Sequence, residues 1–226
     1  MPVVGLIGGI GAGKSRAAAC FGELGGFVLD ADAIGHALLE QSPCRDRVLE
    51  RFGEAVLAPY TSEGERRPID RRALGSIVFA DPAALRDLEG ILHPAMRRTF
   101  DRAIIRQARL GRAAAVVLDA AILYEAGWDT LCDVVVYVDA VDEVRLARLE
   151  AARGWTAEGL AAREKSQGPA EEKRRQADHI LRNDGTPEDL KAAAAALWPR
   201  LIRPNGRKPA PERADAPTSA RGQPSS

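Results

Sequence analysis

Gly8-Gly9-Ile10-Gly11-Ala12-Gly13-Lys14-Ser15 stands between an apolar run, residues 3–7, and an alanine-rich stretch, residues 17–24. This sequence fits the pattern G-x-x-x-x-G-K-[ST], in which glycines let the backbone curl until several N–H groups point at a polyphosphate. The alternative is a glycine-rich turn that matches the pattern by chance. An apolar strand before the motif and a helix after it favour a phosphate-binding loop.

Each part of the predicted loop has an expected task. Lys14 is expected to reach the β and γ phosphates, and the Ser15 hydroxyl is expected to bind Mg²⁺. The helix that opens at Lys14 directs the positive end of its dipole at the anion, and the amides of Ser15 and Arg16 add donors. The predicted nucleotide-binding residues of this stretch are Gly9, Gly11, Ala12, Gly13, Lys14, Ser15 and Arg16.

Length and charge limit the classes of protein to consider. The 226 residues, 46% of them hydrophobic, suffice for one domain with insertions. The formal net charge is +0, so no global basic field indicates nucleic acid, and no apolar run reaches the roughly 18 residues of a membrane span. Since Met1-Pro2-Val3 leads straight into the first predicted strand, we expect a cytoplasmic protein. The three cysteines, Cys20, Cys44 and Cys132, lack metal-site spacing and are expected to be buried thiols.

Five apolar segments are predicted as strands, at residues 3–7, 27–29, 113–119, 133–138 and 179–181. Helical patterns stand between them, which indicates right-handed βαβ units and a mainly parallel sheet. The second segment ends in Asp30-Ala31-Asp32 and the third ends in Asp119. Because parallel sheets bind ligands at the carboxyl ends of their strands, these carboxylates are expected at the site, with Asp119 holding a Mg²⁺-bound water.

Two regions hold more than a simple crossover needs. Residues 59–111 carry helical patterns that begin at Asp70 and at Asp81, with a break expected at His93-Pro94, and we predict a helical acceptor-binding insertion. Residues 143–175 are helical in pattern and rich in arginine. This second region is predicted as a lid that closes over transferring phosphates, with a solvated helix face as the alternative.

The composition changes sharply near residue 203. Prolines fall among Gly, Ser, Ala and charged residues from there to the end. Such a segment buries too little apolar surface to offset its ordering entropy. We therefore predict one phosphate-loop domain over residues 1–202 and a disordered tail over residues 203–226.

Deleting residues 203–226 is expected to leave activity and melting temperature nearly unchanged, because the segment offers no apolar core. Turnover and thermal unfolding of the full and shortened chains test this expectation. A fall of more than a few degrees in the melting temperature would show that the tail packs on the domain.

Motifs spread over residues 5–190 resemble, in order, those of the dephospho-CoA kinase family. Besides the loop, they are Asp30-Ala31-Asp32, Ile69-Asp70-Arg71, Leu92-His93-Pro94, Leu123-Tyr124-Glu125, Arg148, Arg163 with Gln167, Lys173 with Ala177-Asp178, and Asn183-Asp184-Gly185. The loop alone is shared by many enzymes, whereas Asp-Ala-Asp with the later His-Pro and Tyr-Glu is far more selective. The resemblance implies an α/β, three-layer P-loop kinase fold with a five-stranded mainly parallel sheet, a helical substrate-binding insertion and an arginine-bearing lid.

The resemblance also implies an activity and a site. Enzymes of this family phosphorylate the ribose 3′-hydroxyl of dephospho-CoA in the last step of coenzyme A synthesis, so the implied partners are ATP and dephospho-CoA, with Mg²⁺ as cofactor. Asp32 is the implied base, with Asp30 as the alternative candidate and helix capping by Asp32 as the competing interpretation. Lys14, Arg148 and Asp32 form the implied catalytic set, and Arg148 and Asn183 join the nucleotide-binding residues. The implied acceptor-binding residues are Asp30, Asp32, His93, Tyr124, Glu125 and Arg163, and His93 is alternatively a structural residue.

The chain departs from the family pattern at several positions, and the one with most consequence is in the lid. Ala152 stands where a second lid arginine is expected, and Arg153 follows it, rotated by roughly 100° on a helix. Two other classes remain as alternatives, a nucleoside monophosphate kinase-like enzyme and a nucleotide-binding switch. The former is expected to show a different acceptor motif, and the latter an N-K-x-D motif, which this sequence lacks.

Overall fold

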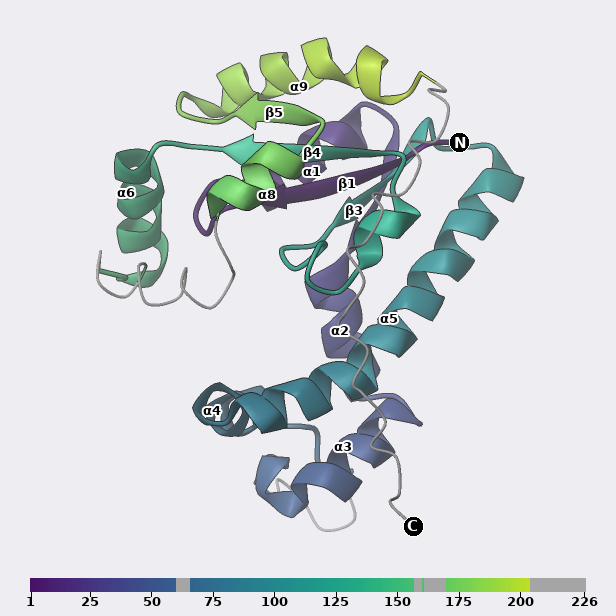
Figure 1. The fold of residues 1–226 in the computed structure, drawn as a ribbon, viewed down its shortest axis with the longest axis vertical. Helices are drawn as coiled ribbons and strands as arrows, with labels where there is room; N and C mark the ends of the chain where they lie inside the picture. The colour runs from purple at the N-terminus through teal and green to yellow at the C-terminus, as the bar shows by residue number, and fades with distance from the viewer. Residues whose placement is uncertain (60–65, 157–159, 161–169, 204–226) are drawn as a thin grey trace, which may run out of the picture.

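A five-stranded parallel sheet forms the middle layer of the protein. The structure, a computed structural model, describes residues 1–59, 66–156, 160 and 170–203. The strands are β1 Val3–Gly8, β2 Gly26–Asp30, β3 Ala115–Asp119, β4 Val134–Asp139 and β5 His179–Arg182. They lie in the order β2-β3-β1-β4-β5, and every neighbouring pair is parallel. All carboxyl ends therefore meet at one edge, on the left in Figure 1, and the predicted α/β fold with a five-stranded sheet is confirmed.

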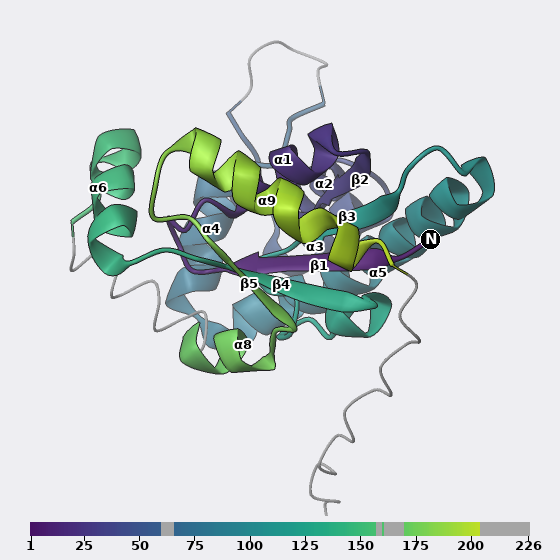
Figure 2. The ribbon, with the colours of Figure 1, turned by 90° about the horizontal axis from the view of Figure 1, so that it is seen from above.

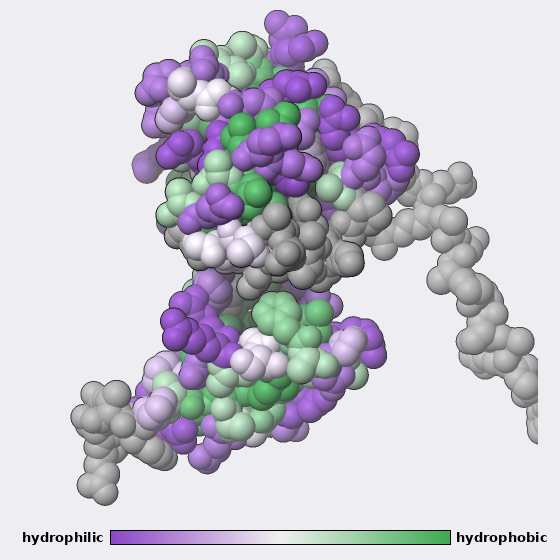
Figure 3. Space-filling model, turned by 90° about the vertical axis from the view of Figure 1, so that its left-hand side faces the viewer, coloured by the Kyte–Doolittle hydropathy of each residue, from purple (hydrophilic) through white to green (hydrophobic). Residues whose placement is uncertain are grey.

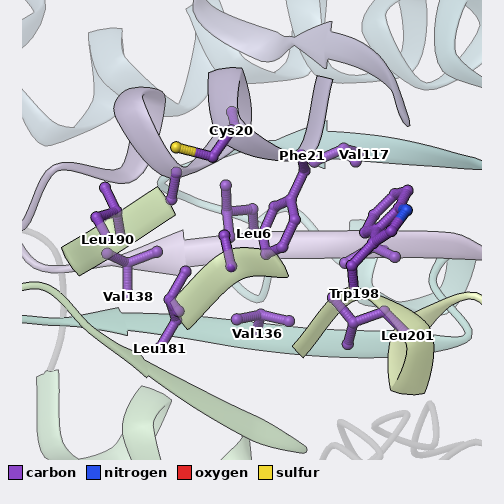
Figure 4. Packing of buried hydrophobic residues seen from close by; sticks show 14 of the residues in the cluster. Leu6, Cys20, Phe21, Val117, Val136, Val138, Leu181, Leu190, Trp198 and Leu201 are labelled. Carbon is purple, nitrogen blue, oxygen red and sulfur yellow. The ribbon is translucent and has the colours of Figure 1, made fainter. Parts of the chain in front are cut away.

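Two helices cover one face of the sheet. They are α1, Lys14–Glu23, and α9, Pro187–Leu201, which runs across the strands in Figure 2. Phe21 of α1 stacks on Trp198 of α9 with ring centroids 5.4 Å apart, and both lie in the buried cluster of Figure 4. This packing holds α1, the helix that begins at the predicted loop, against the sheet.

The other face of the sheet is covered by the second half of α5, Pro82–Leu110, and by η2, Trp128–Leu131. Phe100 of α5 meets Trp128 edge to face, with ring centroids 5.0 Å apart, and both rings are fully buried. The sheet is thus packed between helices on both of its faces, which gives the predicted three-layer arrangement.

A second lobe has a hydrophobic core of its own below the sheet in Figure 1. Its helices are α2 Ala31–Leu39, α3 Cys44–Phe52, η1 Glu54–Val56, α4 Arg71–Ala80 and the first half of α5. The buried members of its core run from Leu39 to Ala95. The lobe therefore begins before the predicted insertion, residues 59–111, and ends within it, because α3 belongs to the lobe and the end of α5 belongs to the sheet layer.

The expected break at His93-Pro94 is wrong, because α5 continues through Pro94. Proline has no N–H for the carbonyl of Gly90, so one helical hydrogen bond is lost. Burial on both sides offsets this loss: Ala95 packs in the second lobe and Phe100 packs under the sheet. The helix changes direction between the two lobes instead of ending (Figure 1).

Two predictions about the burial of side chains are corrected in part. Residues 27–29 were predicted as a short buried strand, but β2 lies at the sheet edge and Phe27 is 36% exposed. Cys20 and Cys44 are buried as predicted, whereas Cys132 is only half-buried.

The predicted lid contains α6, Asp142–Arg153, and α8, Ala170–Gln176. Most of the chain between these helices, including Arg163, lies outside the described residues, as does the predicted tail after Arg203. Among the described helices, none combines the length and apolar character of a membrane span.

Candidate active site

The loop between β1 and α1 has the backbone that the glycine pattern predicted. Gly11 and Gly13 have φ angles of 79° and 87°, a left-handed conformation that favours glycine. A Cβ on Gly13 would lie 2.2 Å from Nδ2 of Asn183, so no larger residue fits there without movement. Gly13 also precedes α1 without a side chain to cap it, which leaves the positive end of the helix dipole for an anion.

A cleft of about 590 Å³ opens over this loop. Its volume is within the range of small-molecule sites. It brings together most of the predicted nucleotide site with one predicted acceptor residue. The predicted residues that line it are Gly9, Gly11, Gly13, Lys14, Ser15, Arg16, Asp32, Arg148 and Asn183. Ala12 is buried beneath the loop and supplies a carbonyl to Asn183 instead.

Lys14 and Asp119 form an ion pair at the floor of the site. The Asp119 side chain is only 4% exposed, and this burial raises the pKa of its carboxyl group, an effect that the Lys14 ammonium opposes. Asp30, which lies opposite Asp119 in the sheet, and Asp32 raise the pKa further through their negative charges. Asp119 is therefore close enough to Asp30 and Asp32 to be affected by their negative charges, and Lys14 is the cation paired with it.

The described residues fit Mg²⁺ as a partner of ATP rather than as a protein-bound ion. They contain no group of three or more His, Cys, Asp or Glu side chains that could hold a metal. Mg²⁺ is commonly held by one or two protein oxygens together with phosphates and waters. The Ser15 hydroxyl at the cleft and the Asp119 carboxylate at the end of β3 are oxygens of that kind.

The structure separates the two carboxylates of the Asp-Ala-Asp motif. Asp30 is the N-cap of α2, and its Oδ1 accepts the Ala33 N–H at 2.9 Å. Asp32 lies in the first turn of α2, is exposed and lines the cleft. The interpretation of Asp32 as the cap is therefore wrong, because Asp30 has that task. Asp32 is the carboxylate that a substrate in the cleft can reach.

Asn183 binds both Arg148 and the loop. Asn183 is 4% exposed; its Nδ2 donates to the Ala12 carbonyl at 2.8 Å, and its Oδ1 accepts from Arg148 Nη2 at 3.3 Å. Arg148 Nη1 is buried and has no hydrogen-bond partner among the described residues. Arg148 Nη1 would lie 3.8 Å from a Cβ atom placed on Gly13, so it is close to the loop. Because an unpaired buried guanidinium nitrogen is costly, this position points to an anion at the loop.

Arg145 supports the same loop from α6, a role that the sequence did not identify. Its side chain is almost fully buried, and Nη1 donates to the Ile10 carbonyl at 3.3 Å while Nη2 donates to Asp142 at 2.8 Å. Arg145 falls within the predicted lid, residues 143–175, whose arginines the sequence did not distinguish. Its place three residues before Arg148, on the same side of α6, was the available signal.

Asp32 is the one described member of the predicted acceptor-binding set that lines this cleft, and His93 and Tyr124 lie away from it. His93 packs edge to face on Trp128 with centroids 5.1 Å apart, and burial lowers its pKa against a smaller opposing effect of Glu89. The Tyr124 hydroxyl is buried without a hydrogen-bond partner among the described residues, and burial raises its pKa. Both side chains are thus placed in or beside the core below the sheet.

Glu125 is joined to α8, the second helix of the predicted lid. Lys173 of α8 lies 2.5 Å from Glu125 Oε1, and its Nζ also donates to the Ala121 carbonyl at 3.2 Å. Ala121 lines the cleft, and the Lys173 side chain is only 11% exposed. Lys173 therefore fixes the segment after β3 at the cleft wall.

Replacing Asn183 by alanine is expected to weaken ATP binding about 10-fold and to destabilise the fold by roughly 1–3 kcal/mol. The reason is that the Ala12 carbonyl and Arg148 each lose a hydrogen bond in a buried place. Titration with ATP and thermal unfolding measure the two effects. Arg182→Ala, one residue away with a side chain 69% exposed, is the matched control and is expected to change neither. Unchanged ATP affinity in Asn183→Ala would contradict the supporting role.

Comparison with known proteins gives one consistent result. A family model described as dephospho-CoA kinase matches residues 2–189. A dephospho-CoA kinase of Symbiobacterium thermophilum is 42% identical over 213 residues, which are 93% of this chain and 85% of the relative. Another from Thermus thermophilus is 38% identical over 88% of this chain and 98% of its own length.

Solved structures agree with the fold. A crystal structure from Thermus thermophilus superimposes with a TM-score of 0.73 at 36% identity, covering 88% of this chain and 97% of its own. A shikimate kinase from Acinetobacter baumannii, at 16% identity and a TM-score of 0.51, covers 89% of this chain and 93% of its own. The second likeness supports the fold alone.

Proposed function

The chain belongs to the dephospho-CoA kinase family, and we propose that it transfers the γ-phosphoryl group of ATP to the ribose 3′-hydroxyl of dephospho-CoA. The products are coenzyme A and ADP. The observation that carries this assignment is the shared cleft, in which Asp32 faces the phosphate loop across one volume of about 590 Å³. A phosphoryl donor at the loop and a hydroxyl acceptor at the carboxylate are what the transfer requires.

The donor side of the proposed reaction is a set of positive groups around the loop. Lys14, Arg148 and the N–H groups at the start of α1 bind the phosphates, and Asn183 orients Arg148. The Ser15 hydroxyl and, through a water, the Asp119 carboxylate would hold Mg²⁺, which would supply neutralising charge when bound with ATP. These groups stabilise the negative charge that develops on the β–γ bridging oxygen as its bond to phosphorus breaks.

The acceptor side depends on Asp32. The 3′-oxygen forms a bond to the γ phosphorus, and its proton passes to the Asp32 carboxylate. Asp30 stays bound to the backbone of α2 and holds the first turn on which Asp32 stands. The predicted roles of His93 and Tyr124 in acceptor binding receive no support from their packing, and Glu125 acts through Lys173 on the cleft wall.

The proposal extends to organisation and location. Residues 1–202 form the kinase domain, with the second lobe as the acceptor-binding region and residues 143–175 as the lid. The three cysteines are free thiols, which suits a reducing compartment, and we place the enzyme in the cytoplasm.

A coupled assay of ADP release tests the function. The protein with ATP and Mg²⁺ is given dephospho-CoA, AMP or no acceptor, in parallel reactions. Release that depends on dephospho-CoA is expected. Equal rates with and without acceptor would indicate an ATPase or a switch, and release that depends on AMP alone would indicate a nucleoside monophosphate kinase.

A further inference from the structure

Phe79 is an exposed aromatic residue on the second lobe. Its side chain is 83% exposed, although Leu74 and Val78 of the same helix are buried in the core of the lobe. The ring lies beside Gly75, where a Cβ would be 3.6 Å from Cε2 of Phe79. Gly75 thus leaves one edge of the ring without a covering side chain. A large apolar side chain left in water in this way indicates a contact that the protein alone does not supply.

Phe79 lies at the end of a continuous face that starts at the active site. On α2, Asp32 and His36 are four residues apart, and on α4 the same spacing joins Arg71, Gly75 and Phe79, so each set shares one side of its helix. The two sets meet where Arg71 Nη1 donates to His36 Nδ1 at 2.9 Å. We call these five residues the α2–α4 face. It leads from the carboxylate in the cleft to the exposed ring on the second lobe.

The orientation of the molecule places this face on the ligand side. The strands end on the left in Figure 1, and α4 lies on the left of the second lobe. Figure 3 looks at that side and shows a hollow between the sheet layer and the second lobe, with hydrophobic side chains on the wall formed by the second lobe. An acceptor that is bound at Asp32 and is longer than the cleft can therefore extend along this side of the molecule toward α4.

Arg71 is available for an anion. It is exposed, and among the described residues no carboxylate forms an ion pair with it. The nearest acidic residue in the chain, Asp70, is occupied as the N-cap of α4, where its Oδ1 accepts the N–H groups of Arg72 at 2.8 Å and Ala73 at 3.2 Å. The contact with His36 leaves four of the five guanidinium N–H donors of Arg71 for a ligand.

We propose that the α2–α4 face binds the part of the acceptor beyond its ribose, an inference that rests on the proposed function. Arg71 binds the 5′-diphosphate, because a planar guanidinium pairs with phosphate oxygens through two parallel hydrogen bonds. Phe79 packs against the apolar section of the pantetheine arm, since its ring offers a large apolar surface. The order along the face, carboxylate then guanidinium then aromatic ring, matches the order of 3′-hydroxyl, diphosphate and arm in dephospho-CoA.

Substrate analogues that lack one part at a time test this assignment. At saturating ATP, the KM of dephospho-CoA is measured together with competitive inhibition constants of ADP-ribose, which keeps the diphosphate but not the arm, and of adenosine, which has neither. Arg71→Gln is expected to raise the values for dephospho-CoA and ADP-ribose roughly 10-fold to 100-fold and to leave adenosine unchanged. Phe79→Ala is expected to raise the KM of dephospho-CoA alone, by roughly 5-fold to 20-fold.

Matched controls separate this proposal from simple changes in charge or stability. Arg72→Gln removes the neighbouring charge from the same helix, and Ile105→Ala removes an exposed apolar side chain from α5; both are expected to behave as the parent. Arg71→Lys keeps the charge without the paired hydrogen bonds and is expected to be intermediate, which provides a second test if the Gln variant is unstable.

A wild type without acceptor-dependent ADP release contradicts the proposed function. A working wild type in which Arg71→Gln equals Arg72→Gln, or in which adenosine is weakened equally, overturns the present proposal alone.

Discussion

Replacing Lys14 by alanine is expected to lower the rate of phosphoryl transfer by on the order of 10³-fold or more, because one positive charge is lost from the phosphate site. In the proposed reaction the ammonium group neutralises the negative charge that grows on the β–γ bridging oxygen, so its removal is expected to cost several kcal/mol of transition-state stabilisation. The measurement is kcat/KM from ADP release with dephospho-CoA. Lys191→Ala is the control, because that lysine is 65% exposed on α9 and pairs with the exposed Glu23. Near-normal turnover of a folded Lys14→Ala variant would refute the assignment of the loop.

The same variant also changes the pH dependence of stability. Without Lys14, the buried Asp119 loses the cation that opposes the rise of its pKa. A carboxyl group with a pKa above its unfolded value binds more protons in the folded state, so its contribution to stability falls as pH rises. The melting temperature of Lys14→Ala, relative to the parent, is therefore expected to be lower at pH 8 than at pH 5. A difference that is independent of pH would mean that Lys14 does not hold the Asp119 charge.

Replacing Asp32 by asparagine is expected to lower kcat by roughly 10²-fold to 10⁴-fold while ATP affinity stays within a small factor of the parent. Asparagine keeps the shape and hydrogen bonding of the side chain but cannot accept the proton of the 3′-hydroxyl. The fold is expected to survive, because Asp32 is exposed and does not cap α2. Measurements of kcat, ATP affinity and melting temperature check the three expectations.

Asp30→Asn is the matched control for this prediction. It removes the same charge two residues away, near the same Lys14–Asp119 pair, and asparagine caps a helix about as well as aspartate. A small change in kcat is therefore expected. If both variants lose activity equally, the effect is electrostatic and neither carboxylate is identified as the base. Retained kcat in Asp32→Asn would eliminate its role as the base.

The features that the sequence predicted correctly are local. The glycines of the loop, the apolar strands and the Asp-initiated helices α4 and α5 each depend on residues a few positions apart, so the pattern is visible in the chain. The carboxylates at the ends of β2 and β3 followed from the rule that parallel strands end at one edge.

The features that the sequence missed depend on distant contacts. The helix break at Pro94 was wrong because burial against two separate cores decides the outcome, and neither core is visible in a local window. The hydrogen bond from Asn183 to Ala12 joins residues 171 positions apart. The capping role went to Asp30 rather than Asp32 because it depends on the residue at which α2 begins, and helix boundaries are the least certain part of a pattern.

The unbroken course of α5 has a consequence for how the protein unfolds. One helix supplies buried side chains to both hydrophobic cores, Ala95 to the second lobe and Phe100 to the sheet layer. Because melting of the second lobe would fray the turns that hold Phe100, we expect the two lobes to unfold as one cooperative unit instead of opening separately. The shared helix is thus expected to make the stability of the sheet layer depend on that of the second lobe.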